Sequence, residues 1–266
     1  MHHSQSLSGR VAIVTGASAG IGQAIALDLA SRGAGVVLNA RREARLDELA
    51  QRITDQHGMI SGKPRAICVP GDASDDETID SMFDSAQEQF AKPADLIVAN
   101  AGRGLSGSVM TSDVAQWEEM IRTNLLGVAK LIRRGGEGLL KLNEERDWTQ
   151  HTSDIVVLGS NVGRHISPFS SMYGATKFGV NSLAEAARRE LGPKGIRVSL
   201  IEPGIVESEF QAVAGYDPES FGALMEKFGP VLAPEDVART IGFIVSQPAG
   251  VHVCDVVIRP TKQDYP

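Results

Sequence analysis

The sequence lacks any apolar run long enough to span a bilayer, and it lacks a run of basic residues. A membrane-spanning helix needs about 20 predominantly apolar residues, so we expect no membrane partner. The formal net charge is −7, and such a chain has few clustered cations to neutralise nucleic-acid phosphates or anionic lipids. Residues 1–5 contain no signal-peptide core, so we expect a cytoplasmic protein. These absences leave small molecules as the expected partners.

Cysteine is also scarce, and the histidines are dispersed. Cys68 and Cys254 both lie in apolar runs, where we expect small buried thiols in a reducing compartment rather than a disulfide. The six histidines show no ligand spacing, so we predict no metal site. The hydrophobic content of 42% and the charged content of 22% are ordinary for a globular protein and argue against disorder.

Short apolar runs alternate with helical patterns along the 266 residues. The expected strands are 11–15, 36–38, 66–69, 96–99, 155–158, 196–201 and 253–258. Strands that are apolar throughout indicate a parallel sheet covered by helices on both faces. We therefore predict one α/β domain over residues 1–266, built as a doubly wound parallel sheet.

Two segments interrupt this alternation. Residues 133–153 contain a Gly-Gly pair and a polar run, which suggest an extended surface connection. Residues 205–232 contain Asp217-Pro218, a helix cap followed by a first-turn proline, and an apolar stripe at helical spacing. Such a stripe is more often core, but its place after a strand's carboxyl end favours a small lid. Its members are Phe221, Leu224, Met225 and Phe228.

Local sequence patterns predict the positions of three further helices. A helix is expected from about Glu43 to His57, and Ser74 with Glu77 three residues later forms the pattern of a capping box at the start of the next one. A third is expected over 172–191.

The segment 15–22 joins the first expected strand to the first expected helix and carries three glycines. Glycines there let backbone N–H groups approach a pyrophosphate at the helix N-terminus, and a serine hydroxyl can add a donor. Glycine triplets also close ordinary tight turns, but the strand–loop–helix context favours nucleotide binding. The predicted contacts are Gly16, Ser18, Gly20, Ile21 and Gly22.

The second expected strand ends in Asn39-Ala40-Arg41-Arg42, without an acidic residue. An acid at this strand end binds the adenosine ribose of NAD, whereas an arginine accommodates the extra phosphate of NADP. We therefore favour NADP over NAD, with Arg41 as the phosphate ligand. Solvent exposure explains Arg42 and Arg45 better than it explains Arg41.

Polar and small residues follow the next two strands. Asp72, with Ala73 beside it, can accept a hydrogen bond from the adenine amine or begin the cap of the next helix, and both roles can hold. The turn Asn100, Ala101, Gly102 lets a cofactor approach closely, although turn chemistry alone would also account for it.

Tyr173 and Lys177 lie one helical turn apart if 172–191 is a helix, so a phenol and an ammonium share one face. A phenol has a pKa near 10, and a nearby positive charge favours its ionised form. Ser160 follows an apolar strand and can bring a second hydroxyl to the same substrate oxygen. The alternative is an amphipathic tyrosine beside a solvated lysine.

Together, these motifs resemble the short-chain dehydrogenase/reductase family over residues 9–259. The matching motifs are T-G-x-x-x-G-x-G at 15–22, N-A-G at 100–102, Asn124, Ser160, Y-x-x-x-K at 173–177 and P-G at 203–204. The resemblance implies a Rossmann fold and a homotetramer or homodimer built through the helices that hold Asn124 and Tyr173.

The resemblance also implies roles. Tyr173 would be the catalytic acid/base, Ser160 would hold the substrate oxygen, and Lys177 would bind the nicotinamide ribose and lower the pKa of the tyrosine. Asn124 would position a water in a proton relay. Further cofactor contacts would come from Pro203, Gly204, Val206 and Ser208.

The chain departs from the family pattern at Ala99, where many relatives carry asparagine, and at Ser208, where threonine is common. Residues 258–263 resemble relatives that act on small hydroxy acids. Arg103, Arg164 or His165 are candidates to hold a substrate carboxylate, or they are surface charges.

The expected function is hydride transfer between NADP(H) and a small alcohol/carbonyl substrate. The alternatives are an NAD-dependent alcohol dehydrogenase of the same family, a non-catalytic NADP-binding regulatory protein, and a nucleotide-sugar epimerase or dehydratase. The last usually has a larger C-terminal substrate domain than the short region after Gly204.

Overall fold

The computed structural model describes residues 6–264. Residues 1–5, on which the expected absence of a signal peptide partly rests, lie outside this range. The main sheet has seven strands in the order β5-β2-β1-β6-β7-β8-β9, and every neighbouring pair is parallel. The strands are β1 Val11–Thr15, β2 Gly35–Ala40, β5 Ala66–Pro70, β6 Leu96–Ala99, β7 Ser153–Leu158, β8 Ile196–Pro203 and β9 Asp255–Ile258. The predicted doubly wound parallel sheet is confirmed.

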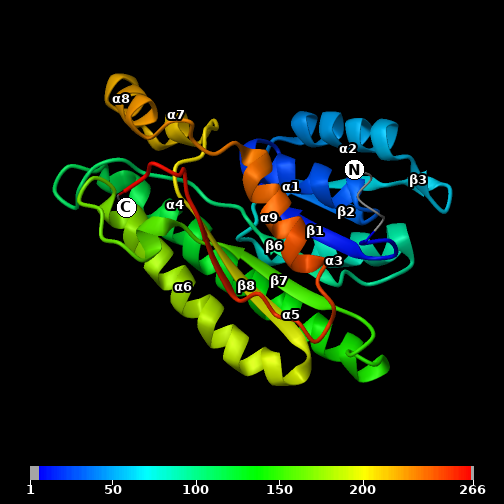
Figure 1. Ribbon diagram of the computed structural model, residues 1–266. Helices are drawn as coiled ribbons and strands as arrows, with labels where there is room; N and C mark the ends of the chain where they lie inside the picture. The colour runs from blue at the N-terminus through cyan, green and yellow to red at the C-terminus, as the bar shows by residue number, and fades with distance from the viewer. Residues whose placement is uncertain (1–5, 265–266) are drawn as a thin grey trace.

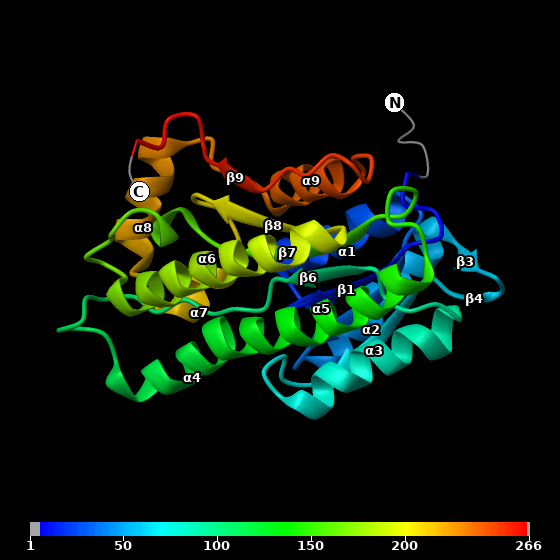
Figure 2. The ribbon, with the colours of Figure 1, turned by 90° about the horizontal axis from the view of Figure 1, so that it is seen from below.

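Helices cover both faces of the sheet (Figures 1 and 2). On one face lie α1 (Gly20–Ser31), α2 (Glu43–His57) and α9 (Pro234–Val245); on the other lie α3 (Asp76–Phe90), α5 (Val128–Glu145) and α6 (Ser171–Leu191). Successive strand residues point to opposite faces. In β1, Ala12 and Val14 pack with the first layer while Val11 and Ile13 pack with the second. This double burial is why the strands are apolar throughout.

The expected extended connection over 133–153 is wrong for most of its length, because α5 continues to Glu145. Its Gly-Gly pair is a packing feature: a Cβ added at Gly135 would lie 3.2 Å from the Ile97 side chain of β6, so glycine lets the helix approach the sheet closely. Arg133 forms an ion pair with Glu137 one turn later on the exposed face. Only the short segment 146–152 connects α5 to β7.

Two further details differ from the sequence reading. The helix α3 begins at Asp76, and Ser74 is not its cap; the Ser74 hydroxyl donates to Asp72 instead. A small hairpin of β3 (Met59–Ile60) and β4 (Lys63–Pro64) follows α2 and had no sequence signal strong enough to predict it. In contrast, α2 spans the expected residues, and α6 begins one residue before its expected start.

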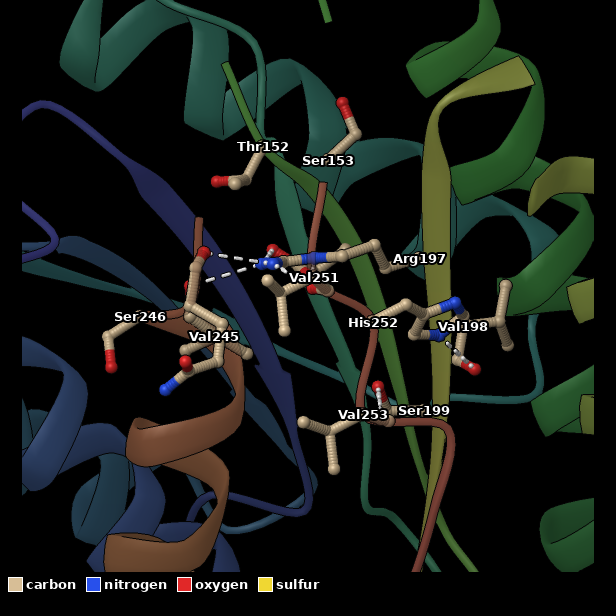
Figure 3. A network of polar contacts seen from close by, with 12 residues as sticks. Thr152, Ser153, Arg197, Val198, Ser199, Val245, Ser246, Val251, His252 and Val253 are labelled. Carbon is tan, nitrogen blue, oxygen red and sulfur yellow. Dashed lines mark hydrogen bonds and ion pairs between the residues drawn. The ribbon is translucent and has the colours of Figure 1, made fainter. Parts of the chain in front are cut away.

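A buried arginine fastens the last strand to the sheet (Figure 3). Arg197 on β8 donates two hydrogen bonds to Asp154 on β7, and both residues are buried. The same guanidinium donates to backbone carbonyls at the last residue of α9 and in the connection to β9. These carbonyls belong to Val245, Gln247, Pro248 and Val251. The network holds residues 245–254 along β8, where His252 also contacts the Val198 carbonyl at 2.9 Å.

The chain between β8 and α9 forms a separate projection at the carboxyl edge of the sheet (gold and orange in Figure 1). It contains α7 (Phe210–Ala214) and α8 (Pro218–Phe228), and Asp217 caps α8 by accepting the Ser220 N–H at 2.8 Å. Residues 104–107 are bonded to this segment, since the Ser106 N–H donates to the Ala214 carbonyl at 2.9 Å. We refer to residues 205–232 as the lid segment.

Short helical turns complete the fold. Before α5 they are η1 (Val114–Gln116), α4 (Trp117–Ile121) and the π-helical turn η2 (Arg122–Gly127); after β7 and α6 they are η3 (Asn161–Gly163) and η4 (Gly192–Lys194). Within residues 6–264, no helix combines the length and apolar character that a membrane crossing requires.

Candidate active site

A cavity of about 720 Å³ lies at the carboxyl ends of the strands. Strand order reverses between β1 and β6, and such a switch point is where doubly wound sheets bind ligands. Every residue predicted from the sequence to contact a cofactor lines this cavity. They are Gly16, Ser18, Gly20, Ile21, Gly22, Arg41, Asp72, Ala73, Asn100, Ala101, Gly102, Tyr173, Lys177, Pro203, Gly204, Val206 and Ser208.

The glycine loop fits the pyrophosphate of a dinucleotide. Gly16 and Gly20 have φ of +67° and +53°, a region that favours glycine. A Cβ on Gly22 would overlap the Gly16 carbonyl oxygen, so only glycine lets α1 pack this closely on the turn. Ala19 at the N-cap of α1 has no polar side chain to occupy the first N–H groups of the helix. Backbone donors at a helix N-terminus are the groups that bind an anionic phosphate.

The turn after β6 is fastened to the end of β1. The Thr15 hydroxyl accepts the N–H groups of Asn100 and Ala101, each at 3.1 Å, and donates to the Val98 carbonyl. The Asn100 amide donates in turn to the Thr15 carbonyl at 2.8 Å. These bonds hold the 100–102 turn beside the glycine loop. The turn and the loop both line the cavity, and we call this part of the lining its floor.

Arg42 is the arginine that touches the glycine loop. Its Nε and Nη2 donate to the Ser18 hydroxyl at 3.2 and 3.1 Å. Its Nη1 also pairs at 3.0 Å with Glu209 of the lid segment, which pairs with Arg45 at 2.7 Å. Arg42 lines the cavity, so its sequence-based interpretation as a solvated side chain is incomplete.

Arg41 also lines the cavity, on the side of α4. It pairs with Glu119 at 3.2 Å, and Glu119 in turn accepts from Arg103. The Arg41 side chain is 67% exposed, whereas that of Arg103 is 15% exposed. The carboxylate of Glu119 therefore lies between the two guanidinium groups.

Asp72 lies on the same side. Its carboxylate accepts from the Ser74 N–H and hydroxyl and pairs with Arg122 at 2.9 Å. Despite partial burial, the serine hydrogen bonds and Arg122 lower the pKa of Asp72.

Ser160, Tyr173 and Lys177 converge at the other end of the cavity floor. The Ser160 hydroxyl is hydrogen-bonded to the Tyr173 phenol. The Lys177 ammonium lies 5.8 Å from the centre of the Tyr173 ring and donates to the Leu158 carbonyl at 2.6 Å. The Phe210 ring packs against the tyrosine with ring centres 5.6 Å apart. Two hydroxyls and one ammonium are thus brought together from the turn after β7 and from α6.

Local structure explains this convergence. Strand β7 ends at Leu158, and Ser160 follows in an extended conformation as the N-cap of η3, where its hydroxyl accepts the Val162 N–H. The helix α6 begins at Ser171, so Tyr173 lies in its first turn and Lys177 one turn later.

Burial sets the pKa values of these groups. It raises the pKa of the Tyr173 phenol, which the hydrogen bond from Ser160 opposes, and it lowers the pKa of Lys177 to about 8. That Lys177 lowers the pKa of Tyr173 therefore stays a prediction. The lysine head group is directed at the Leu158 carbonyl, and desolvation dominates the phenol.

Asn124 lies outside the cavity lining, fully buried in the π-helical turn η2. Its side-chain oxygen accepts the Arg103 N–H at 2.8 Å, and its amide donates to the Arg103 carbonyl at 2.8 Å and to the Thr176 hydroxyl at 3.2 Å. Its side chain thus braces the 100–103 turn against α6. π-helical turns are frequent at functional sites.

Of the three candidate carboxylate ligands, only Arg103 lines the cavity, and all three already have partners. Arg103 lines the cavity, but it is bonded to Glu119 and Gln116. Arg164 pairs with the buried Glu202, and His165 contacts Arg259. Within residues 6–264, no three His, Cys, Asp or Glu side chains are grouped as a metal site.

Several residues that line the cavity were not predicted individually from the sequence as site residues. Glu209, Phe210 and Tyr216 belong to the lid segment, and Gln263 reaches the cavity from the C-terminal segment, where it accepts the Ile205 N–H at 3.0 Å. The position of Glu209 and Phe210 directly after Ser208 was an available signal. Gln263 is 58 residues from its partner, a relation that local pattern does not reveal.

The sequence model described as short chain dehydrogenase matches residues 10–218. The chain belongs to the short-chain dehydrogenase/reductase family. An uncharacterised oxidoreductase of Staphylococcus epidermidis is 32% identical over 251 residues, covering 94% of this chain and 97% of the relative. Membership in this family makes the chain an oxidoreductase acting on CH–OH and C=O groups.

Solved structures of similar proteins agree with the family. The closed form of serine dehydrogenase with NADP+ is 28% identical, with a TM-score of 0.82 and 96% coverage of both chains. A 3-ketoacyl-(acyl-carrier-protein) reductase from Brucella melitensis with NADH is 25% identical, with a TM-score of 0.83, 96% coverage of this chain and 99% of the other. The first of these structures holds NADP+ and the second holds NADH, so proteins of this fold accommodate both forms of a nicotinamide dinucleotide.

Proposed function

We propose that this protein transfers hydride between NADP(H) and an alcohol/carbonyl pair, with Tyr173 as the acid/base. The observation that carries the proposal is the meeting of Ser160, Tyr173 and Lys177 on the floor of a cavity that also contains the glycine loop. Nicotinamide, when bound, supplies or accepts the hydride at the substrate carbon. The chain's own residues handle the oxygen and its proton.

In the reducing direction, the phenol of Tyr173 donates its proton to the substrate oxygen as the carbonyl becomes an alcohol. The Ser160 hydroxyl donates a hydrogen bond to the same oxygen, where negative charge develops. Lys177 holds the nicotinamide ribose and places a positive charge beside the phenolate that remains. Asn124 holds the backbone of Arg103 through two hydrogen bonds. In this position it places a water molecule in the relay that returns the proton to Tyr173.

The preference for NADP rests on the cations beside the adenosine end of the cavity. Arg41 and Arg42 both line it, and Arg42 is anchored to Ser18 of the glycine loop. Strand β2 ends at Ala40. The residues that follow directly are these two arginines, and no acidic side chain stands there to bind the adenosine ribose of NAD. In this arrangement, Asp72 accepts a hydrogen bond from the adenine amine.

The central test measures NADPH oxidation over a panel of carbonyl compounds. Tyr173→Phe should reduce kcat/KM by about 100- to 10,000-fold, the usual contribution of a general acid, while the Kd of NADPH stays within a few-fold. Tyr216→Phe removes the second phenol among the described residues that line the cavity, and it should lower kcat/KM by less than about tenfold. Retained turnover in Tyr173→Phe would refute the assignment. Cofactor binding without turnover on any carbonyl would favour a regulatory binding protein.

The cofactor preference is tested by titrating NADPH and NADH into the protein. Arg42→Ala and Arg41→Ala should each weaken NADPH binding by about 10- to 100-fold, because each removes a charged hydrogen-bond donor. NADH binding should hardly change. Arg45→Ala is the matched control, since Arg45 shares Glu209 but does not line the cavity. Equal affinity of the unmodified protein for both cofactors would refute the preference.

We also propose a cytoplasmic homodimer or homotetramer. Leu126 in η2 and Phe178 in α6 are 51% and 42% exposed, which leaves apolar side chains on the helical elements that hold Asn124 and Tyr173. Light scattering coupled to size exclusion measures the assembly, and Phe178→Glu should lower its mass.

A further inference from the structure

The substrate end of the cavity has an apolar and largely aromatic wall. Beyond Tyr173, the lid segment and the chain before α6 supply large apolar side chains. These are Phe169, Phe210, Val213, Phe221, Leu224 and Phe228. Contact with such a wall favours hydrocarbon over charged groups, because apolar surface leaves water on binding and a charge would lose its hydration.

The cations near this wall already have partners. Arg103 is bonded to Glu119 and Gln116, and Arg164 does not line the cavity and is paired with Glu202, whose side chain is fully buried. Lys227 lies 4.6 Å from the centre of the Phe228 ring and 3.7 Å from Asp264, with 61% of its side chain exposed. A substrate carboxylate would have to displace one of these contacts.

A carboxylate at the same end also disfavours an anionic substrate. Asp264 lines the cavity, and it would repel an anionic substrate that approached Lys227. Burial also raises the pKa of the Tyr216 phenol, which is hydrogen-bonded to Ser170 and is thus neutral at pH 7. The polar groups of this end are therefore neutral or already paired.

We propose that the substrate is an uncharged, apolar ketone or the corresponding secondary alcohol. Its oxygen lies at Tyr173 and Ser160, and its hydrocarbon part lies along the lid segment. The apolar wall continues to the mouth of the cavity, where Phe169 and Val213 are 73% and 60% exposed. A long hydrocarbon group is therefore accommodated as well as a short one. The proposal rests on the proposed function, and it differs from the small hydroxy acids on which relatives resembling residues 258–263 act.

The first experiment compares two ketones with one carbon skeleton. The compound 4-phenyl-2-butanone carries a methyl group where 2-oxo-4-phenylbutanoate carries a carboxylate. With NADPH, the methyl ketone should have a kcat/KM at least tenfold higher, although the oxo acid is intrinsically the more reactive carbonyl. In the straight-chain series from 2-butanone to 2-octanone, kcat/KM should rise by about two- to fourfold per added CH₂, as expected for burial of a methylene group.

Variants test whether the wall causes the preference. Val213→Arg adds a cation at the lining and should shrink the ratio of methyl ketone to oxo acid at least tenfold. Val114→Arg is the matched control, because Val114 is similarly exposed at 67%, lies in η1 and does not line the cavity. Its ratio should equal that of the unmodified protein.

Binding is measured in parallel by calorimetry on the complex with NADP+, so that the outcome does not depend on turnover. Tighter binding of the methyl ketone supports the proposal. Preference for the oxo acid, or a chain-length dependence below twofold across the whole series, overturns it. If the oxo acid is reduced efficiently and Tyr173→Phe abolishes that activity, the proposed function stands and only the substrate class fails. If neither compound is reduced but the methyl ketone binds selectively, the function fails and the substrate class stands.

Discussion

We expect Lys177 to lower the free energy of unfolding at neutral pH, because its ammonium group is buried. The residue is 6% exposed, and burial lowers its pKa to about 8. A lysine in the unfolded chain titrates near pH 10.4, so the folded protein holds this proton less tightly than the unfolded chain does. The difference corresponds to about 3 kcal/mol of free energy of unfolding at pH 7.

The pH dependence has a definite sign. Below about pH 8 both states carry the proton, and the full penalty is present. Between about pH 8 and pH 10.4 the folded protein has released the proton while the unfolded chain retains it, so unfolding takes up a proton and the free energy of unfolding rises with pH. Above that range this penalty is gone.

Lys177→Met removes the charge and keeps most of the side-chain volume. It also removes the hydrogen bond to the Leu158 carbonyl, worth about 1 to 2 kcal/mol. We therefore expect the variant to be more stable than the unmodified protein by about 1 to 2 kcal/mol at pH 7. At pH 10 it should be equally or less stable, and it should lack activity at both.

Urea unfolding followed by tryptophan fluorescence, at fixed protein concentration from pH 6.5 to 10, measures the difference between the two proteins. Subtracting the two curves removes the contributions of the other titrating groups. A difference that does not change with pH, or a variant that is less stable at pH 7, would refute the claim that burial of this charge destabilises the fold.

Three further substitutions test the fold and the cofactor end of the cavity. Arg197→Met should lower the free energy of unfolding by about 3 kcal/mol or more, because it leaves buried Asp154 with one partner fewer; a loss below 1 kcal/mol in urea unfolding would contradict this. Glu209→Gln should tighten NADPH binding by up to about fivefold by releasing Arg42 from an exposed ion pair, and weaker binding by calorimetry would show that the pair helps hold the cofactor. Gly22→Ala should abolish binding of both NADPH and NADH, since its Cβ would overlap a backbone oxygen of the glycine loop; unchanged fluorescence titrations would disprove that.

The layered fold was predictable because its strands are buried on both faces. Runs such as 11–15 and 155–158 are apolar at every position, and this property alone indicates a parallel sheet between two helical layers. The glycine loop and the Tyr173–Lys177 step were predictable for a similar reason, since each depends on spacing along a single strand–loop–helix unit. The side chains expected at the cofactor all line one cavity.

The sequence-based expectations were wrong or incomplete where contacts between residues far apart in the sequence determine the local structure. The polar and glycine-rich run after residue 133 suggested a loop, but α5 continues through it to Glu145, and Gly135 lets the helix pack closely on Ile97 of β6. Arg42 looked like a solvated side chain because its partner Glu209 is 167 residues away. The partners of Arg41 and Gln263 are separated from them by 78 and 58 residues, so tertiary structure alone pairs them.

The cavity is polar at one end and apolar at the other, and this asymmetry orders its ligands. Arg41 and Arg42 bring positive charge to the edge near β2, while Phe221 and Leu224 bring hydrocarbon to the edge near the lid segment. An anionic phosphate gains free energy only at the first end, and an apolar ketone gains it only at the second. Tyr173 lies between them. Under the proposed function, these opposed end groups direct the phosphate and the hydrocarbon away from the phenol and leave the reacting groups beside it.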